Sequence, residues 1–496
     1  MISAFFLIAR LCTLGVRWPI GIGENSIERW LRKAEPVSST SGLATKDARG
    51  TGVSRERTGI RWENKVGSAS SLPTRIVSVT TVDEVVDAVR HAAINGEQVH
   101  ATGAGFAMTG IAAAPGVLID TSELRGMVRV DDTLGTATFL AGTTVDEANA
   151  ELRKYGAAMI GAPGDGKATL GGAVATGAHG YAPREASFSA LIDGVTLVTG
   201  EGRLLKISER TNMHYLPAAR LNLGALGVIA EVTVKFRRYA KLRINRKRRN
   251  IERLVSDILE ARAKTDFYRV DWRPHGDQAL LTVGWLEDEA EALEAAAYPA
   301  IAAQAEPRLQ TKPRKRARFR EKLAKFLPFL APAIDRVSNL FDRTGAESVR
   351  QSTDVSGDAD YGLQVEYQFP IAKARQVVAE LGRLVSSGKA FAAANVRISL
   401  VAADGVWLSP AYGEDVVAVC LQLPGRFEEG AEQALRQAEN LFIDLGGLPN
   451  WGGWHTLNGA EAAYVMPRYG DFAHIRTDLD PHGRTDNSAL SRLLKH

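Results

Sequence analysis

The sequence HATGAGFAM at residues 100–108 places two glycines one residue apart, directly after a strand-like run. A second glycine-rich stretch, GAPGDGKATLGGAVATGAHG, spans residues 161–180. Loops of glycine and other small residues let backbone N–H groups approach a large flat or phosphorylated ligand, because no Cβ obstructs them. Met108 stands where a dinucleotide fingerprint needs its third glycine, and no amphipathic helix follows, so a Rossmann fold is excluded. Two tight turns in a sheet protein are the alternative interpretation for either stretch alone.

Length and composition indicate a globular protein with more than one domain. The chain has 496 residues, too many for a single core, and its hydrophobic and charged fractions of 45% and 24% are ordinary. Its two cysteines, Cys12 and Cys420, stand far apart, so neither a disulfide framework nor a cysteine metal site is expected, and we predict no metal. A reducing, cytoplasmic location follows from the same observation.

The first 61 residues predict a lead-in that is partly disordered, since serine, threonine and glycine are frequent in it. Residues 1–23 are apolar but are interrupted by Arg10 and Arg17, which leaves no run long enough to span a bilayer. A degenerate signal or anchor is the alternative interpretation of that segment.

The order of expected helices and strands favours an α+β fold. Thr81 and Thr144 each precede a helical pattern that has two acidic residues in its first turn. Before residue 237 the alternation of apolar and polar residues predicts strands, with hairpins at 127–141 and 191–207 and a long strand at 227–236. The composition changes near Arg237, which marks a domain boundary. Beyond it the same patterns predict strands at 267–283, 362–370, 395–402 and 415–422, and helices at 287–305, 371–385 and 428–445.

Five stretches in order carry a resemblance to a known family. They are the first glycine loop at 103–107, LGGAVATGAHG at 170–180, LGALGVI at 223–229, AADGVWLSPAY at 402–412 and DLDPHGR at 478–484. Together they resemble the flavin-dependent oxidoreductases of the vanillyl-alcohol-oxidase type, and most closely the aldonolactone (D-arabinono-1,4-lactone and L-gulonolactone) and alditol oxidase family. Thr485 replaces the aromatic residue with which that family's last motif ends.

The resemblance implies a two-lobed PCMH-type FAD-binding domain at residues 62–238, an α+β substrate (cap) domain at 239–445, and a segment at 446–496 that completes the flavin site. It also implies which residues contact FAD: Thr102, Gly103, Ala104, Gly105, Phe106, Ala107, Gly171, Gly172, Thr176, Gly180, Val228 and Ile229. Phe106 stands where the family often has a histidine bonded covalently to the flavin. Because phenylalanine has no nucleophilic atom, non-covalent FAD is predicted.

The implied reaction oxidises an alcohol group of a sugar-derived lactone or polyol-like substrate, with hydride passing to flavin N5 and oxygen or another acceptor reoxidising the flavin. The family's Glu-x-Arg on the cap strand reads Asn395-Val396-Arg397 here, and its His-Trp-x-Lys begins with Asn450 and ends with Gly453. The arginine is therefore kept, while the carboxylate, the histidine and the lysine are lost.

An amide has no useful basicity at neutral pH, so the proton acceptor stays open among His179, His275 and His455. We take Arg397, His179 and Asn395 as the catalytic candidates. Asn450, Trp407 and Trp451 are the substrate-binding candidates, since flat rings pack on the C–H faces of sugars; an ordinary core role is the alternative for each tryptophan. An FAD-binding protein with lost or altered catalysis is the alternative function.

Two segments, Arg237–Arg253 and Lys312–Lys325, are rich in lysine and arginine. No nucleic-acid motif accompanies them, so no nucleic-acid partner is expected. The second runs into FLPFL at 326–330, which is typical of an amphipathic helix on anionic lipid. Peripheral membrane contact through 312–330 is therefore the alternative to the favoured interpretation, in which both segments are solvated helix faces. The expected partners are a small-molecule alcohol and an electron acceptor.

Overall fold

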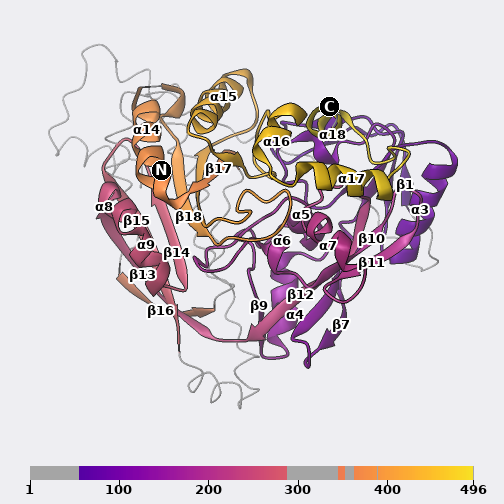
Figure 1. The fold of residues 1–496 in the computed structure, drawn as a ribbon, viewed down its shortest axis with the longest axis horizontal. Helices are drawn as coiled ribbons and strands as arrows, with labels where there is room; N and C mark the ends of the chain where they lie inside the picture. The colour runs from indigo at the N-terminus through magenta and orange to yellow at the C-terminus, as the bar shows by residue number, and fades with distance from the viewer. Residues whose placement is uncertain (1–54, 288–344, 352–361, 388, 495–496) are drawn as a thin grey trace, which may run out of the picture. The chain divides into compact units, whose positions relative to one another are not determined.

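The computed structural model describes residues 55–287, 345–351, 362–387 and 389–494. The chain divides into two compact units, Met1–Val53 and Ser54–His496, and every described residue belongs to the second unit. Helices and strands are mixed along it, so the predicted α+β class is confirmed (Figure 1). The predicted helix at 287–305, the basic segment at 312–330 and most of the lead-in at 1–61 lie outside the described residues.

The strands, in chain order, are β1 Arg55–Arg57, β2 Trp62–Glu63, β3 Ser70–Ser71, β4 Arg75–Ser78, β5 Val99–Thr102, β6 Val117–Asp120, β7 Met127–Asp131, β8 Thr136–Leu140, β9 Ala157–Met159, β10 Gly194–Val198, β11 Leu204–Ser208, β12 Val228–Arg238, β13 Lys241–Asn250, β14 Phe267–Trp272, β15 Gln278–Leu286, β16 Gly345–Gln351, β17 Leu363–Pro370, β18 Asn395–Val401, β19 Val416–Leu423 and β20 Leu448–Pro449.

The α-helices are α3 Val82–Ile94, α4 Val145–Arg153, α5 Leu170–Ala175, α6 Phe188–Leu191, α7 Leu216–Ala219, α8 Ile251–Ser256, α9 Ile258–Lys264, α14 Ala374–Ser387, α15 Glu429–Asp444, α16 Gly459–Val465, α17 Tyr469–Leu479 and α18 Ser488–Leu494. The short 3₁₀ helices are η1 Gly110–Ala112, η2 Met213–Tyr215, η4 Ile371–Lys373 and η5 Lys389–Phe391.

The first sheet is small and has the strand order β1-β4-β6-β5. The first glycine loop begins at the carboxyl end of its strand β5. Strands β4, β6 and β5 are parallel, and α3 connects β4 to the edge strand β5. The predicted N-cap Thr81 forms a capping box with Glu84, whose carboxylate in turn accepts from the backbone N–H of Thr81. The apolar face of α3 packs on this sheet.

A second sheet, in the order β11-β10-β12-β8-β7, supports the second glycine stretch. Its strands pair antiparallel, as the predicted hairpins require. Two details differ from prediction: the strand expected from residue 191 begins only at Gly194, because residues 188–191 form α6, and α5 occupies part of the stretch at 161–180. The Thr169 side chain caps α5 by accepting from Gly172 N.

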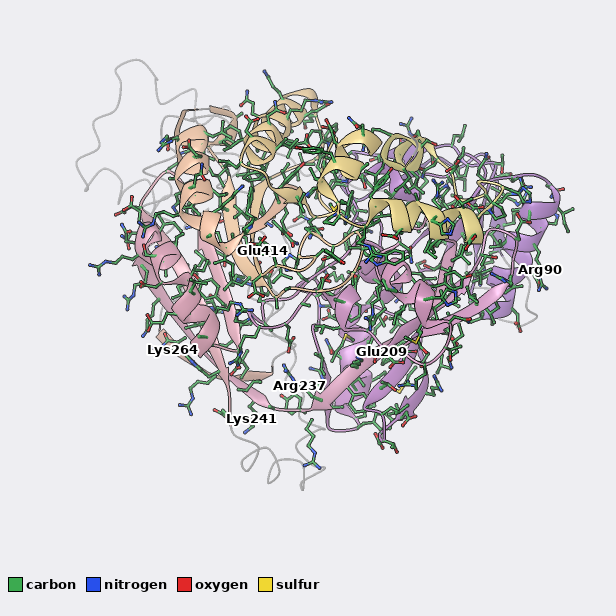
Figure 2. The ribbon with its side chains drawn as sticks, in the orientation of Figure 1. Arg90, Glu209, Arg237, Lys241, Lys264 and Glu414 are labelled. Carbon is green, nitrogen blue, oxygen red and sulfur yellow. The ribbon has the colours of Figure 1, made fainter. Side chains whose placement is uncertain are left out.

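An eight-stranded sheet, in the order β16-β13-β15-β14-β18-β19-β17-β20, forms the other half of the unit. One of its faces packs in a hydrophobic core, in which Tyr367, Phe369 and Val419 contact side chains of α14 and α15, among them Phe442. The chain crosses between the two large sheets from β12 to β13, near Arg237 and Lys241 (Figure 2).

The helical interpretation of the basic segment Arg237–Arg253 is wrong. Residues 241–250 form β13, which pairs with β15 on one side and β16 on the other. The reason is a period of two in the sequence: Leu242 and Ile244 are buried, while Arg243 and Lys247 on the opposite face are exposed. Only after Asn250, which caps α8, does the chain become helical.

The C-terminal segment contains three helices, α16, α17 and α18, that the turn-rich composition did not predict. They return to the N-terminal half of the unit, beside the indigo segments (Figure 1). The buried amide of Asn487 donates to the carbonyl oxygens of Gly110, Ile111 and Ala113, just beyond the first glycine loop. Thr485, in place of the family's aromatic residue, is buried and donates to Ala225 O. No helix in the described part is long and apolar enough to cross a bilayer.

Candidate active site

A cavity of about 290 Å³ lies where the two glycine loops meet the eight-stranded sheet. Its walls on the loop side come from residues 100–108, the second glycine stretch and the turn at 222–224. Of the residues predicted to contact FAD, those that line this cavity are Thr102, Gly103, Ala104, Gly105, Phe106, Ala107, Gly171, Gly172, Thr176 and Ile229. Val228 instead lies in a core cluster, and Gly180 lines a smaller neighbouring cavity.

Several glycines of the loops are packed closely against neighbouring segments. A Cβ on Gly103 would lie 2.2 Å from Thr169 Oγ1, and a Cβ on Gly171 would lie 3.0 Å from the Cβ of Ala141. At Gly227, which has a φ of +133°, a Cβ would lie 2.2 Å from Val198 O. Gly103, Gly105, Gly171 and Gly172 line the cavity and have no side chain, so the loops present backbone there, which fits the diphosphate and flat rings of FAD.

The opposite wall is the polar face of the eight-stranded sheet. Alternation along β17, β18 and β19 puts three residues of each strand on this face, and the cross-strand register aligns them in rows. The rows are Gln364–Gln422–Asn395, Glu366–Cys420–Arg397 and Gln368–Ala418–Ser399. Six of these side chains line the cavity: Gln364, Glu366, Arg397, Ser399, Cys420 and Gln422.

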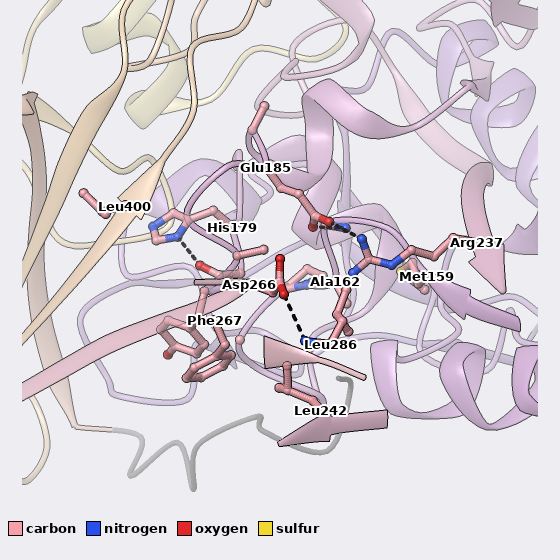
Figure 3. Close-up of a pocket in the computed structure, with 17 residues that line it drawn as sticks. Met159, Ala162, His179, Glu185, Arg237, Leu242, Asp266, Phe267, Leu286 and Leu400 are labelled. Atoms are coloured by element: carbon pink, nitrogen blue, oxygen red, sulfur yellow. Dashed lines mark hydrogen bonds and ion pairs between the residues drawn. The ribbon is translucent and has the colours of Figure 1, made fainter. Parts of the chain in front are cut away.

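His179, from the second glycine stretch, meets Glu366 in this cavity. His179 Nε2 lies 2.8 Å from Glu366 Oε1, and its Nδ1 lies 3.1 Å from Gly180 O (Figure 3 shows His179). The same Glu366 oxygen accepts a 2.7 Å hydrogen bond from the amide of Asn450, which also lines the cavity. Both neighbours of the imidazole are acceptors, so this geometry holds it with a proton on each nitrogen.

The electrostatics of the pair agree with that geometry. Burial alone would lower the pKa of His179, but the charge and hydrogen bond of Glu366 outweigh it and raise the pKa above its ordinary value. Burial would likewise raise the pKa of Glu366, yet the charge and hydrogen bond of His179, helped by the Asn450 amide, lower it. Both shifts favour the imidazolium–carboxylate form of the pair.

Arg397 lies in the same row as Glu366, two strands away, and is oriented by Asp271 of β14. Arg397 Nε lies 3.3 Å from Asp271 Oδ1, and Arg269 Nε lies 2.8 Å from Asp271 Oδ2. Burial would raise the pKa of Asp271, but the two guanidinium groups lower it, so the carboxylate is ionised. The Tyr181 ring lies beside both guanidinium groups, with its centroid 5.3 Å from Arg269 Cζ and 6.0 Å from Arg397 Cζ.

The other two histidine candidates lie away from the cavity. His275 lies in the turn between β14 and β15, where its Nε2 contacts the carbonyl of Phe391. His455 is 3% exposed and packs edge-on against Trp451, with 5.3 Å between ring centroids. Burial, followed by the charge of Arg492, lowers its pKa to about 3, so it is a neutral core residue. Only His179 of the three is placed to take part in catalysis.

Two tryptophans expected to line a substrate pocket are placed elsewhere. Trp451 is 1% exposed and donates its indole N–H to Leu408 O, within the core of the FAD-binding half. Trp407 packs on the same core, with the guanidinium of Arg468 5.1 Å from its ring. Trp451 is in the interior and Trp407 is partly buried against the same core, so neither side chain lines the cavity. Asn395 is on the correct face, but its amide donates to Gln422 Oε1 and it does not line the cavity.

Glu366 and Asp271 are the residues that the sequence alone did not identify. The alternation of GLQVEYQFP did place Gln364 and Glu366 on one face, and this was the available signal for Glu366. A second cavity of about 50 Å³ lies on the far side of His179, where Glu185 pairs with Arg237 at 2.8 Å (Figure 3). It is too small for a cofactor.

Glycine loops that expose their backbone, facing a sheet that offers an acid–imidazole pair and an arginine, define an FAD-dependent oxidoreductase. Comparisons with known proteins agree. Residues 73–208 match the model of an FAD binding domain, and residues 232–493, more than half of the chain, match that of D-arabinono-1,4-lactone oxidase. The chain therefore belongs to the D-arabinono-1,4-lactone oxidase family.

The relatives and solved structures extend over nearly the whole chain. The L-gulono-1,4-lactone dehydrogenase of Mycobacterium tuberculosis is 27% identical and is matched over 87% of this chain and 99% of its own. The L-gulonolactone oxidase of Scyliorhinus torazame is 25% identical, over 88% and 98% of the two chains. Cholesterol oxidase from Brevibacterium sterolicum shares the fold, with a TM-score of 0.70 at 14% identity, over 89% of this chain and 98% of its own.

Proposed function

We propose that this enzyme oxidises an alcohol group of a sugar-derived lactone or a polyol-like substrate. The observation that carries the proposal is the cavity in which both glycine loops face Glu366, His179 and Arg397. The names of the relatives, which are lactone dehydrogenases and oxidases, point to the same substrate class. Asn395 stands where the family has a carboxylate, and this loss was the reason to consider a protein without catalysis. Glu366 supplies a buried carboxylate in the same cavity, which favours an active enzyme.

FAD is held without a covalent bond in this proposal. The residues that would hold it are the small residues at 102–107, Gly171, Gly172, Thr176 and Ile229, since all line the cavity. Phe106 lines it too and offers only carbon atoms. When bound, FAD supplies the hydride acceptor, and oxygen or another acceptor takes the electrons onward. The division into an FAD-binding domain at 62–238, a cap at 239–445 and a completing segment at 446–496 follows the change of sheet after β12.

The acid–imidazole pair accepts the hydroxyl proton in our mechanism. In the active form the imidazole of His179 is neutral and its Nε2 faces the Glu366 carboxylate. The substrate hydroxyl gives its proton to the carboxylate, and the proton ends on His179 Nε2, where the ion pair of the resting structure is restored. Activity therefore rises as pH rises through the raised pKa of His179. Arg397 supplies positive charge beside the reacting groups. Asn395 acts through Gln422, which it orients.

The expected location is the cytoplasm, with peripheral membrane contact through 312–330 as the alternative. Three measurements test the proposal as a whole. A visible spectrum of the purified protein should show a bound flavin. Anaerobic mixing with a panel of aldonolactones and alditols should bleach that spectrum. Acid precipitation should release the flavin into the supernatant, and flavin that stays with the pellet would show that non-covalent binding is wrong.

A further inference from the structure

The wall of the cavity carries one permanent positive charge. Among the described residues that line the cavity, Arg397 is the only lysine or arginine. The imidazolium of His179 is paired with the carboxylate of Glu366, so that pair adds little net charge. Oxidation of an alcohol transfers negative charge to the flavin, and fixed positive charge beside the flavin stabilises its reduced form. The position of the Arg397 guanidinium therefore affects the reaction.

Asp271 holds that guanidinium from outside the cavity. It stands directly opposite Arg397 on the neighbouring strand, and its Oδ1 lies 3.3 Å from Arg397 Nε. Arg397 lines the cavity, whereas neither Asp271 nor Arg269 does. The carboxylate engages Nε alone, so within the described part of the chain no hydrogen bond or ion pair uses Nη1 or Nη2 of Arg397. Asp271 can therefore act on the reaction only through Arg397.

The carboxylate of Asp271 is itself fixed from a second side. Arg269 Nε lies 2.8 Å from Asp271 Oδ2, so each carboxylate oxygen is engaged by one guanidinium. The ring of Tyr181 lies beside both guanidinium groups, 5.3 Å from Arg269 Cζ and 6.0 Å from Arg397 Cζ. Cys420, the neighbour of Arg397 on β19, is uncharged because burial raises the pKa of its thiol. Among the described residues, Asp271 is thus the only ion-pair partner of Arg397.

We propose that Asp271 is a positioning residue of this reaction: through Arg397 Nε it holds the guanidinium beside the flavin, and Arg269 fixes Asp271 in turn. The inference rests on the proposed function and adds two residues to it. An arginine side chain is long and flexible, so its guanidinium stays in one place only where a partner holds it. Without Asp271 the guanidinium leaves its place, and the reduced flavin loses the charge that stabilises it.

The flavin midpoint potential of the holoprotein, titrated against a reference dye, separates positioning from a simple charge effect. Asp271→Asn removes a negative charge, so the potential would rise if the Arg397 guanidinium kept its place. If Asp271 positions Arg397, the guanidinium moves away and the potential falls instead. We expect the ratio of reduced to oxidised flavin at a fixed potential to fall about tenfold, as for a unit charge moved a few ångströms away. That is about 30 mV for a two-electron couple.

Further variants test whether Asp271 acts through Arg397. Arg397→Gln should lower the potential, and adding Asp271→Asn to it should not lower it further. Arg269→Gln combined with Asp271→Asn keeps the net charge of the cluster, yet it should also lower the potential. Arg397→Lys should lower it as well, because a single ammonium cannot engage Asp271 and face the flavin at once. Asp193→Asn is the matched control, since Asp193 is a buried carboxylate paired with Arg210 outside the cavity, and it should leave the potential unchanged.

A raised or unchanged potential in Asp271→Asn would overturn the proposal. If that variant does not fold, an unchanged potential in Arg397→Lys or in the combined Arg269→Gln and Asp271→Asn variant would overturn it equally. Loss of FAD from all of these variants but not from the Asp193→Asn control would also overturn it, because the residues would then build the FAD site rather than position a charge. An unaltered protein that is purified without flavin would count against the proposed function itself.

Discussion

Replacing Glu366 by glutamine tests the proton-accepting pair most directly. Glu366→Gln keeps the size of the side chain and a carbonyl oxygen for His179 and Asn450, but it removes the charge that raises the pKa of His179. Since burial then dominates, the pKa of His179 should fall. We expect kcat/KM to fall by about 10²- to 10³-fold, within the range of general base catalysis. The pH at which kcat/KM is half-maximal should move down.

The same substitution has a defined effect on stability. The raised pKa of His179 contributes stability that is present below 6.5 and is lost as pH rises through the raised value. The lowered pKa of Glu366 contributes stability that is present above 4.5 and is lost as pH falls through the lowered value. The loss of unfolding free energy caused by Glu366→Gln should thus be greatest between pH 4.5 and 6.5. With side chains only 7% and 14% exposed, we expect about 1–3 kcal/mol, since glutamine keeps an acceptor.

The assay is a pH profile of kcat/KM by anaerobic flavin reduction, with urea unfolding of the same samples. Glu209→Gln serves as the control, because Glu209 is an ion-paired carboxylate on the surface of the FAD-binding half. A Glu366→Gln profile that keeps both the midpoint and the plateau of the unaltered enzyme would refute the reasoning. A loss of activity with an unchanged midpoint would mean that the carboxylate does not act through His179.

Three further predictions concern the walls of the site. Gly103→Ala should abolish FAD binding, because the new Cβ would lie 2.2 Å from Thr169 Oγ1. Gly276→Ala is the control and should keep FAD, because a Cβ there has open space around it. The flavin content after purification measures both variants. Trp451→Phe removes a buried indole hydrogen bond and should lower the free energy of unfolding in urea by about 1–3 kcal/mol, with KM unchanged. A raised KM would indicate that Trp451 contacts the substrate after all. The pKa of the buried His455 imidazole is lowered to about 3, so below pH 6.5 this residue gains a proton on unfolding and the protein loses stability as pH falls. His455→Phe should therefore reduce the loss of stability between pH 6.5 and 4.5. An unaltered pH dependence of the free energy of unfolding would contradict this.

Much of the fold could be predicted from local sequence patterns. The two glycine loops, the capping boxes at Thr81 and Thr144 and the strands that carry Arg397 and Glu366 are each decided by a few neighbouring residues. Caps, turns and the period of two depend on backbone geometry within one element, so they survive in the sequence without knowledge of the rest. The helical interpretation of residues 237–253 was wrong because the buried Leu242 and Ile244 alternate with more exposed basic residues, which is the pattern of a strand.

The partners of the active-site residues were decided by the tertiary structure alone. Alternation tells which face of a strand a side chain is on, but the order and register of strands in a sheet depend on contacts between distant segments. Glu366, Cys420, Arg397 and Asp271 form one row only because β17, β19, β18 and β14 are neighbours in that order. His179 reaches Glu366 across 187 positions of sequence. The family motif showed that a carboxylate was missing at residue 395, and only the folded chain could show that Glu366 brings one into the same cavity.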